Sequence, residues 1–315
     1  MISGARILIA GGTGMIGSAL IAELSAGGAI VDVLTRGDTF APRNSGIRAM
    51  VHWEPGVVLE IDPNVQYDII INLAGYSLSH LPWTSKRRSL ILHSRLDATS
   101  ALIEWMRSST HPPHTFINAS AVGFYGDRGD EVLTEASGHG TGFLADVVAA
   151  WEEEASDALT ISHAKRPIRV AWLRTGLVLG PSGALSPVRL LTSLGVGGRL
   201  GTGNQWWPWV SLRDEVRAIV HVIERGLSGP INLVGPTPAT QEEIGRTLAQ
   251  LMGKPFWLPA PRFAISLLLG VGGRELLLTS QRVSPVVLAA SGFRFEHTNA
   301  REALNWVLDE LATER

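Results

Sequence analysis

The chain carries its clearest fold signal near its start, in Arg6-Ile7-Leu8-Ile9-Ala10-Gly11-Gly12-Thr13-Gly14-Met15-Ile16-Gly17. A short apolar run ends in a glycine-rich turn, and a helical pattern of apolar residues follows. This order predicts a strand, a phosphate-binding loop and a helix. Gly11 allows a tight turn, Gly14 lets the backbone approach a pyrophosphate, and Gly17 lets the helix pack closely. The helix N-terminus suits an anion, so we expect a dinucleotide to be held by Gly11, Thr13, Gly14, Met15, Ile16 and Gly17.

The second expected strand, over 30–34, indicates which dinucleotide is bound. In an NAD site this strand usually ends in an acidic residue that accepts a hydrogen bond from the ribose 2′-hydroxyl. Here Asp32 lies inside the strand, and Thr35 and Arg36 occupy its end. A guanidinium holds a 2′-phosphate through paired hydrogen bonds, whereas a carboxylate repels it. The sequence therefore favours NADP(H) over NAD(H), and the alternative for Arg36 is an ordinary solvated loop charge.

The composition excludes several classes of protein. The 315 residues are 45% hydrophobic and 18% charged, which allows a sizeable buried core. A formal net charge of −2 with no basic block argues against nucleic acid or a membrane surface as a partner. The chain has no cysteine, and its nine histidines show no metal-ligand spacing, so no metal site is expected. No targeting signal or spanning segment is visible, which predicts a cytoplasmic protein.

Strand and helix patterns alternate along the chain, which predicts parallel strands with helices on both faces of the sheet. We expect strands at 6–10, 30–34, 69–73, 115–119, 168–173 and 230–234. We expect helices at 84–108, 144–158, 213–226 and 240–252, and a mostly helical segment over 261–311.

The predicted fold class is α/β, a Rossmann-type doubly wound parallel sheet with a smaller, mostly helical C-terminal lobe. We assign 1–235 to the NADP-binding domain, with 181–212 contributing to the substrate side, and 236–315 to a C-terminal helical substrate or lid region. The glycine-rich segment 195–203 precedes no helix-capping pattern, so it is not interpreted as a second phosphate loop. The acidic run Glu152-Glu153-Glu154 is interpreted as a solvated helix face.

Two segments extend the pattern of the glycine loop, Asn72-Leu73-Ala74-Gly75 and Ser120-Ala121-Val122-Gly123-Phe124-Tyr125-Gly126. Together they resemble the extended short-chain dehydrogenase/reductase superfamily, which includes nucleotide-sugar epimerases and dehydratases. The resemblance implies an active-site hydroxyl after the fourth strand and a Tyr-x-x-x-Lys pair on the next helix, whose tyrosine moves a proton. This chain has no Tyr-x-x-x-Lys, and the matching positions are Phe143 and Val147, which cannot titrate. Ser120 remains in the place of the hydroxyl.

Further motifs narrow the resemblance, and they span nearly the whole chain: 94–99, 118–135, 173–180, Gln205-Trp206 with Trp209, and Gln281-Arg282-Val283 with Pro285. With the helical segment from about 254 to 302, they are similar to one atypical branch of the superfamily, the epimerase-family proteins. That branch binds NADP(H), and its physiological substrate is not established. It often has Trp-Ile-His where this chain has Trp209-Val210-Ser211, so any role of that histidine is absent or replaced here.

The resemblance also implies roles for individual cofactor residues. Residues 11–17 would hold the pyrophosphate, and Thr35 and Arg36 the 2′-phosphate. The others would surround the rest of the cofactor: Leu73 and Ala74 on the adenosine side, with Gly75 at the same edge, Arg95 reaching in from the long helix, and Val178 beside the nicotinamide.

Ser120 and Tyr125 are the catalytic candidates. Tyr125 follows Ser120 by five residues, on a loop expected to face the nicotinamide, and the alternative is a packed loop aromatic. The acids Asp127, Asp130 and Glu131 would serve as a base if desolvated, or else form a solvated turn with a local ion pair to Arg128. Arg174 ends a strand near the cofactor edge or makes an internal ion pair. Trp206, Trp207 and Trp209 line a pocket or fill the junction between the lobes.

These observations favour an NADP(H)-dependent oxidoreductase or epimerase-like enzyme that acts on an unknown small molecule. The alternative is a catalytically silent NADP(H)-binding sensor or regulatory protein, because both titrating groups are missing while the cofactor site is kept. Sugar-nucleotide epimerisation would need a diphosphate pocket, which Arg174, Arg199 and Arg213 are able to supply. By analogy with short-chain reductases, pairing through the helices at 84–108 and 144–158 would give a homodimer.

Overall fold

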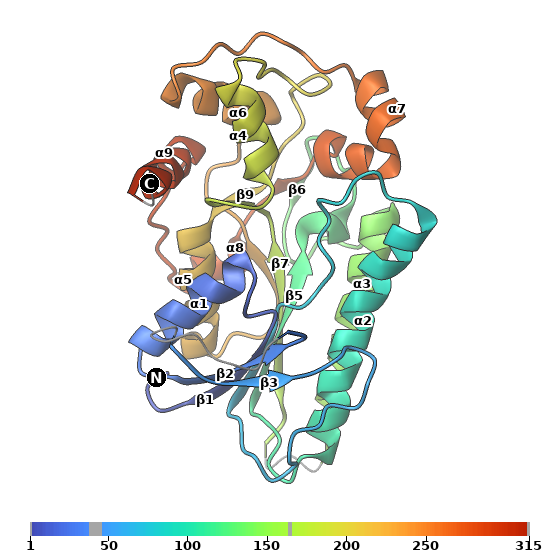
Figure 1. Ribbon diagram of the computed structural model, residues 1–315, viewed down its shortest axis with the longest axis vertical. Coiled ribbons are helices and arrows are strands. Elements are labelled where there is room, and N and C mark those ends of the chain that lie inside the picture. The colour runs from blue at the N-terminus through green and yellow to red at the C-terminus, as the bar shows by residue number, and fades with distance from the viewer. Residues whose placement is uncertain (1, 38–45, 163–165, 314–315) are drawn as a thin grey trace.

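The computed structural model describes residues 2–37, 46–162 and 166–313. Within these residues, the central sheet has seven parallel strands in the order β10-β7-β5-β4-β1-β2-β3 (Figure 1). The strands are β1 (Arg6–Ala10), β2 (Ile30–Thr35), β3 (Ile47–His52), β4 (Ile69–Asn72), β5 (Thr115–Ala121), β7 (Arg169–Thr175) and β10 (Gly229–Leu233). The expected doubly wound parallel sheet is confirmed.

The sequence analysis missed β3, and the reason is its place in the sheet. β3 is an edge strand, and none of its residues is fully buried. The central strands are buried on both faces, so they form continuous apolar runs that a pattern search finds easily. The edge strand mixes apolar residues with Arg48 and His52 and gives no such run.

The strand order reverses between β1 and β4. From β1 the sheet continues outward to β2 and β3, and from β4 it continues in the other direction to β5, β7 and β10. In open α/β sheets, ligands bind outside the carboxyl ends of the strands at such a switch point. The glycine loop follows β1 and residues 73–75 follow β4, so the fold brings both predicted cofactor segments to this edge.

Two layers of helices cover the sheet (Figure 1). Along β1, Ile7 packs with Leu20 on one face, while Leu8 packs with Leu102 on the other, as the alternation of a strand requires. The first face is covered by α1 (Met15–Ala26) and α5 (Leu212–Arg225), and the second by α2 (Ser85–Ser108) and α3 (Phe143–Ser156).

A smaller lobe forms the upper end of the molecule in Figure 1. It consists of α4 (Leu185–Ser193), α6 (Gln241–Leu251), α7 (Arg262–Gly273) and the loops 195–208 and 252–261. Buried residues such as Trp207, Ile244 and Leu248 make its core. Two more helices, α8 (Val286–Ala290) and α9 (Ala300–Thr313), pack against β10 and β9 respectively. No helix in the described ranges is long and apolar enough to cross a membrane.

Two short parallel pairings connect distant parts of the chain. They join β8 (Leu177–Leu179) to β9 (Trp209–Ser211), and β6 (Val132–Leu133) to β11 (Arg282–Val283). Gln281, just before β11, donates its side-chain amide to the backbone oxygens of Val122 and Gly126. We call 280–283 the strap, because it fastens the lobe to the loop that follows β5. Three short turns complete the fold: η1 (Val122–Tyr125), η2 (Asp157–Thr160) and the π-helical η3 (Arg274–Leu278).

The N-terminus of α3 is capped by a side chain from the lobe. Gly142 precedes the helix and provides no capping side chain. Instead, the Glu275 carboxylate, in η3, accepts hydrogen bonds from the backbone N–H groups of Phe143 (2.8 Å) and Leu144 (2.7 Å). A carboxylate at this position satisfies two free N–H groups and interacts favourably with the helix dipole.

We expect Glu275→Ala to lower the free energy of unfolding by about 1–2 kcal/mol, because α3 loses its cap and the lobe loses one attachment. Urea denaturation measures this difference. Glu153→Ala is the matched control, since Glu153 is an exposed acid on the same helix, and equal effects of the two substitutions would contradict the capping role.

Candidate functional site

The glycine loop has the geometry of a pyrophosphate cradle. Gly11 has φ +79°, and a Cβ there would lie 2.6 Å from the carbonyl carbon of Leu73. A Cβ on Gly17 would lie 2.4 Å from the Gly11 oxygen, so both glycines are needed for packing. A Cβ on Gly14 would meet only the Gly11 oxygen, at 3.4 Å. The backbone of Gly14 therefore faces open space, and α1 begins there with no side-chain cap and no acid in its first turn. These features fit a bound pyrophosphate.

The end of β2 offers a cation and no free carboxylate among the described residues. Thr35 is buried and accepts a hydrogen bond from the Gly37 N–H, while Arg36 is exposed. Asp32 is fully enclosed, and its carboxylate accepts hydrogen bonds from Arg48 and from the Tyr67 hydroxyl. Asp32 is thus unable to reach a ribose. Burial of Tyr67, together with its hydrogen bond to Asp32, raises the pKa of this phenol.

A buried polar network fixes the turn that follows β4. Asn72 donates its side-chain amide to Asn118 Oδ1 (2.8 Å) and Thr99 Oγ1 (2.9 Å), and its own Oδ1 accepts from the Ala74 N–H (3.1 Å). The network therefore joins β4, β5 and α2 beneath Leu73, Ala74 and Gly75. Since Leu73 lies against Gly11, the turn and the glycine loop have a fixed relation to each other.

Arg95 lies directly over the turn after β4. A Cβ on Gly75 would be 3.2 Å from the Arg95 Cζ, and Arg95 Nη1 donates to the backbone oxygens of Ile91 and Tyr76. Burial lowers the pKa of the guanidinium to about 10. No carboxylate in the described ranges pairs with it. A partly buried cation at this edge suits an anionic part of a ligand.

The remaining predicted cofactor residue, Val178, reaches the same region through β8. Val178 is largely buried and pairs with Val210 of β9. The loop after β8 touches the glycine loop, because a Cβ on Gly180 would lie 2.8 Å from Met15 Sδ. The structure thus places β8 beside residues that follow β1.

Ser120, Glu152 and Arg174 form a polar cluster at the carboxyl ends of β5 and β7. Ser120 Oγ donates to Glu152 Oε1 (2.6 Å), and Arg174 donates to both Glu152 oxygens (2.8 Å each). Ser120 and Arg174 are paired in register on β5 and β7, and Glu152 projects from α3. Burial opposes the charge on Arg174, yet the hydrogen bonds and charge of Glu152 leave its pKa raised.

For Glu152, the expectation of a solvated helix face is wrong. Its side chain is only 12% exposed, because it faces the sheet rather than solvent. The sequence contained a signal for this orientation. Glu152 shares the helical spacing of Ala145, Val148 and Ala155, which are all buried. The internal ion pair considered for Arg174 is the arrangement found.

Tyr125 lies behind this cluster rather than at its surface. The side chain is fully buried in η1, and its hydroxyl donates to Asn232 Oδ1 (2.7 Å) and accepts from Arg174 Nη1 (3.0 Å). Burial raises the pKa of this phenol, and Arg174 opposes that rise. The phenol is therefore enclosed, and Arg174 lies between it and Glu152.

The acidic loop after η1 is engaged in contacts rather than free. Arg128 and Glu131 form the local ion pair. Asp127 accepts from the Ser280 N–H of the strap, and Asp130 accepts from Trp206 Nε1 (2.8 Å). Asp127 and Asp130 thus bind the loop to the lobe.

Phe143 and Val147, the positions expected to match the missing tyrosine and lysine, lie in an apolar cluster. The Phe143 ring packs edge-on against Trp83, with 5.7 Å between ring centroids. In the part of the chain that the structure describes, no group of three His, Cys, Asp or Glu side chains is arranged to hold a metal ion.

Comparison with known proteins identifies the family. Residues 7–235 match the model of the NAD dependent epimerase/dehydratase family, and residues 260–307 match a domain of unknown function (DUF1731). The chain belongs to the NAD dependent epimerase/dehydratase family. The relation expected from the sequence, to epimerase-family proteins, is confirmed by two bacterial relatives. Epimerase family protein ML0860 of Mycobacterium leprae is 37% identical, over 96% of this chain and 95% of that protein. Epimerase family protein MW0731 of Staphylococcus aureus is 35% identical, over 97% of this chain and 99% of that protein.

Solved structures of the family agree with this assignment. The human epimerase family protein SDR39U1 (isoform 2), solved with NADPH, matches with a TM-score of 0.83 and 26% identity over 96% of this chain and 99% of that chain. The nucleoside-diphosphate sugar epimerase from Corynebacterium glutamicum matches with a TM-score of 0.74 and 30% identity, covering 99% of this chain and 61% of that one.

Trp206, Trp207 and Trp209 of this epimerase/dehydratase chain each bond to a distant part of the chain. Trp209 Nε1 donates to the Thr237 oxygen, and Trp207 Nε1 lies 3.4 Å from the Leu277 oxygen that accepts from it. Trp206 bridges to Asp130, and Arg282 of the strap lies over its ring.

A histidine from the C-terminal segment lies beside Ser211. His297 Nδ1 is 2.9 Å from Ser211 Oγ, and the His297 backbone N–H donates to Asp214. The sequence analysis noted that many family members have histidine at position 211 and considered its role absent or replaced. The structure brings an imidazole to that place from 86 residues away, which no local pattern indicates.

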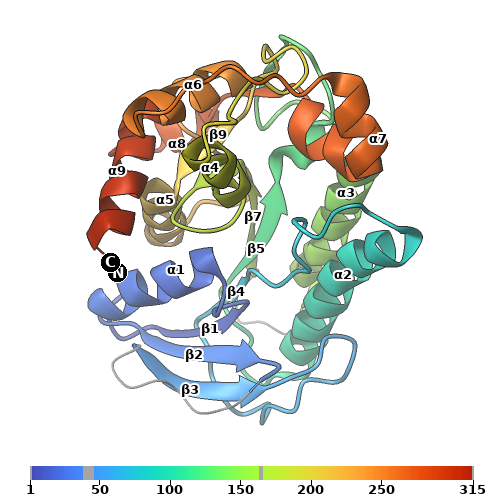
Figure 2. The ribbon, with the colours of Figure 1, turned by 45° about the horizontal axis from the view of Figure 1, so that its top comes forward.

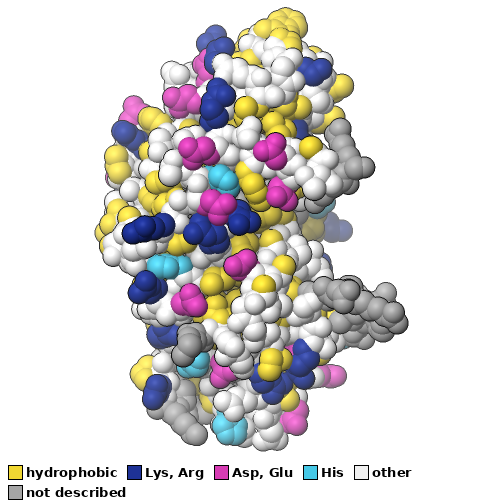
Figure 3. Space-filling view, turned by 90° about the vertical axis from the view of Figure 1, so that its left-hand side faces the viewer, with side chains coloured by type: hydrophobic (Ala, Val, Ile, Leu, Met, Phe, Trp, Pro, Cys, Tyr) yellow, Lys and Arg dark blue, Asp and Glu magenta, His cyan; other side chains and the backbone are white. Residues whose placement is uncertain are grey.

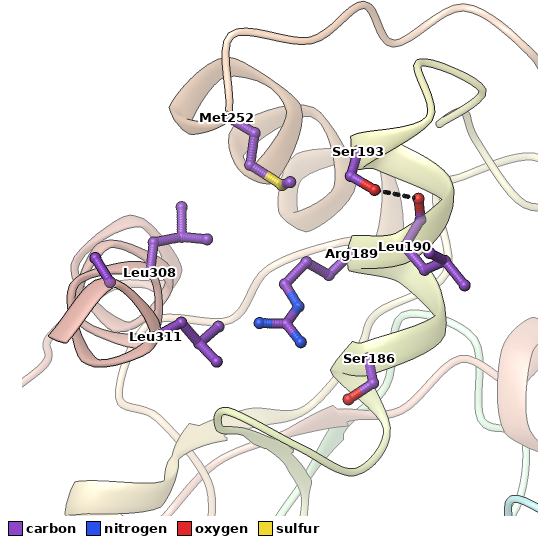
Figure 4. Close-up of a pocket in the computed structure, with 8 residues that line it drawn as sticks. Ser186, Arg189, Leu190, Ser193, Met252, Leu308 and Leu311 are labelled. Carbon is purple, nitrogen blue, oxygen red and sulfur yellow. Dashed lines mark hydrogen bonds between the residues drawn. The ribbon is translucent and has the colours of Figure 1, made fainter. Parts of the chain in front are cut away.

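A separate pocket of about 410 Å³ lies between α4, the end of α6 and α9 (Figure 4). Arg189 extends toward its centre, with Leu308 and Leu311 opposite. None of the predicted site residues lines it. The loops that follow β4 instead rise beside α7, on the other side of α4 in the view of Figure 2.

Glu215 is a buried acid behind the end of β7. It is 1% exposed, its Oε1 accepts from Thr175 Oγ1 (2.8 Å), and its Oε2 has no hydrogen-bond partner. Burial raises the pKa of this carboxyl to about 8, against an ordinary value of 4.5. Glu215 is therefore protonated in the folded protein at neutral pH.

Because folding raises the pKa of Glu215, protonation of this carboxyl stabilises the folded state at low pH. This contribution to the free energy of unfolding is lost as the pH rises. Between about pH 4.5 and 8 the folded state binds the extra proton, so stability should fall by about 1.4 kcal/mol per pH unit on its account. Denaturation of the wild type and Glu215→Gln across this range measures the slope. A wild-type slope equal to that of the variant would contradict a protonated Glu215.

Proposed function

We propose that this protein is an NADP(H)-dependent oxidoreductase of the epimerase/dehydratase type. Its substrate would be a carbonyl or carbinol compound, with nucleotide sugars as one candidate class. The observation that carries the proposal is the hydrogen bond from Ser120 to Glu152 at the carboxyl end of β5, on the edge of the sheet to which the glycine loop also belongs. It offers a hydroxyl joined to a proton acceptor in a chain that lacks the usual Tyr-x-x-x-Lys pair.

The end of β2 supports NADP(H) as the cofactor. Arg36 is exposed at this end, and Asp32 is enclosed by Arg48 and Tyr67. The presence of NADPH in the structure of the human relative agrees with this choice. Residues 11–17 would hold the pyrophosphate, and Arg95 would face an anionic or polar part of the cofactor beside Gly75.

When bound, the cofactor supplies a carbon that accepts or donates hydride. The protein's part is to move the matching proton. Because Ser120 Oγ donates to Glu152, its lone pairs are free to accept a proton from a substrate hydroxyl. The Ser120 proton then passes to Glu152 Oε1 as the substrate carbon is oxidised, and the reverse transfer protonates the oxygen of a carbonyl.

Arg174 and Tyr125 are positioning residues in this scheme. Arg174 holds Glu152 through two hydrogen bonds, and Tyr125 holds Arg174 from behind. Of the three arginines considered for a diphosphate, Arg174 and Arg213 pair with Glu152 and Glu296. Arg199 is exposed and has no carboxylate partner among the described residues, so it is the one left for a nucleotide-sugar substrate.

The cofactor preference is tested by titrating the protein with NADPH and NADH, followed by nicotinamide fluorescence. We expect Arg36→Ala to weaken NADPH binding by about tenfold to a hundredfold and to leave NADH binding unchanged, because only NADPH carries the 2′-phosphate. Arg294→Ala, which removes an exposed arginine elsewhere, is the control. Equal affinity for both cofactors in wild type and variant would overturn the NADP(H) assignment.

The proton path is tested with Ser120→Ala and Glu152→Gln. A panel of carbonyl compounds and nucleotide sugars is offered with each cofactor form, and hydride transfer is followed by nicotinamide absorbance. We expect each variant to lose about a hundredfold or more in turnover while still binding NADPH. Ser156→Ala, on the same helix as Glu152, should behave as wild type, because its hydroxyl only contacts the Glu153 backbone oxygen.

The second candidate is a sensor that binds NADP(H) without turnover. The observation in its favour is that Phe143 and Val147 replace both titrating groups with side chains that pack in an apolar cluster. Tight NADPH binding with no hydride transfer to any compound of the panel would select this function. Turnover that depends on Ser120 would exclude it.

A further inference from the structure

The lobe carries several large apolar side chains that are largely exposed to solvent. On α7, Phe263 is 73% exposed, Leu267 81% and Leu268 73%. In the loop just before the helix, Trp257 is 64% exposed and Leu258 44%. We call these five residues the apolar ridge. Exposed apolar side chains that occur singly are normal, but a contiguous group of them marks an interaction site. Phe263, Leu267 and Leu268 form such a group, because residues four and five positions apart lie on the same side of α7.

The apolar ridge is not needed to hold α7 in place. The opposite face of the helix does that, since Ile265 is buried and a Cβ on Gly272 would collide with Leu81 and Trp83. The indole N–H of Trp257 is already satisfied by the Gly195 oxygen (3.0 Å), so only its ring is left exposed. The ridge therefore protrudes from a helix that is fixed by other contacts.

The exposed charges of 254–274 that have no ion-pair partner among the described residues are all positive. Lys254, Arg262 and Arg274 are exposed, and no carboxylate within the described residues pairs with them. The three acids of 236–290 are all engaged: Glu242 with Arg246, Glu243 in the N-terminal cap of α6, and Glu275 in the cap of α3. The segment 236–290 thus has five Lys and Arg residues and three acids, although the net charge of the chain is −2.

We propose that the apolar ridge docks on the surface of an anionic lipid bilayer. Aliphatic and aromatic side chains flanked by arginine and lysine are the composition of helices that lie in the membrane interface. Tryptophan is favoured at the level of the headgroups, and the flanking cations match anionic lipids in charge. Figure 3 shows the side of the molecule away from α7, where hydrophobic side chains alternate with Lys, Arg, Asp and Glu.

A bilayer fits this surface better than a second copy of the chain. A twofold dimer through the ridge would bring the same patch of each copy together. Lys254, Arg262 and Arg274 would then face their own counterparts with no acid between them. Docking on a bilayer differs from spanning one, and it requires only the face of a single helix.

The inference reverses the expectation that a membrane is not a partner, and it has a consequence for the site. Glu275 follows α7 directly and caps α3, the helix that carries Glu152. The ridge on α7 is therefore connected to the proton acceptor Glu152 through two elements, η3 and α3. Docking is independent of the proposed reaction, because it needs no cofactor and no turnover.

The test is sedimentation of the full chain with vesicles of phosphatidylcholine, with and without phosphatidylglycerol. We expect binding to the anionic vesicles, weaker binding to the neutral ones, and loss of the difference at high salt. The double variant Phe263→Ser/Leu267→Ser should bind both kinds of vesicle at least about tenfold more weakly, since two apolar side chains no longer leave water. Arg262→Gln/Arg274→Gln should weaken binding to anionic vesicles alone.

The controls are Val58→Ser and Leu159→Ser, which remove apolar side chains elsewhere that are 74% and 53% exposed. Far-ultraviolet circular dichroism and NADPH binding confirm that each variant is folded. The proposal is overturned if the wild type fails to sediment with anionic vesicles, or if the double variant binds as well as the wild type. It is also overturned if the wild type ignores vesicles and forms a concentration-dependent dimer that the double variant cannot form.

Discussion

The ion pair between Glu152 and Arg174 is the interaction on which the site depends. Removing two charges from water costs several kcal/mol for each ion, and only good geometry with further hydrogen bonds compensates for this. Here Arg174 donates two hydrogen bonds to the Glu152 carboxylate, which also accepts one from Ser120. Arg174 donates a further hydrogen bond to the Tyr125 hydroxyl, and its Cζ lies 3.6 Å from the centroid of the Phe124 ring. Because the pair joins β7 to α3, the direction of the Ser120 hydroxyl is set by the same contact that docks the helix on the sheet.

The lobe and the sheet meet around this pair. Glu275 holds the first turn of α3 from the lobe, and Arg174 holds the same helix from the sheet. The strap 280–283 adds a third attachment, since it binds the loop after β5 through Gln281 and Ser280. The helix α3, which carries Glu152, is thus held from both the lobe and the sheet, and this keeps its carboxylate in place before a ligand arrives.

The fold, and the place of the glycine loop at the carboxyl edge of the sheet, were predictable because their signals are local. The residues of each apolar run lie within a few positions of one another in the sequence. The same is true of the glycines of the loop, and of β2 and the residue that follows it. The partners of Glu152 and Tyr125 were not predictable, since they lie 22 and 107 residues away. Spacing located Tyr125 five residues after Ser120 but not the direction of its side chain, and the turn η1 directs the phenol into the interior. The edge strand β3 was missed for a related reason, because its environment is set by neighbours in space.

The contact between Ser211 and His297 bears on how the family is compared by sequence. Position 211 is a serine in this chain, yet an imidazole occupies the space beside Asp214, with 5.6 Å between its ring centroid and that of Trp306. It comes from the C-terminal segment, 86 residues further along the chain. A comparison that looks at position 211 alone would therefore overlook an imidazole that is present in the fold.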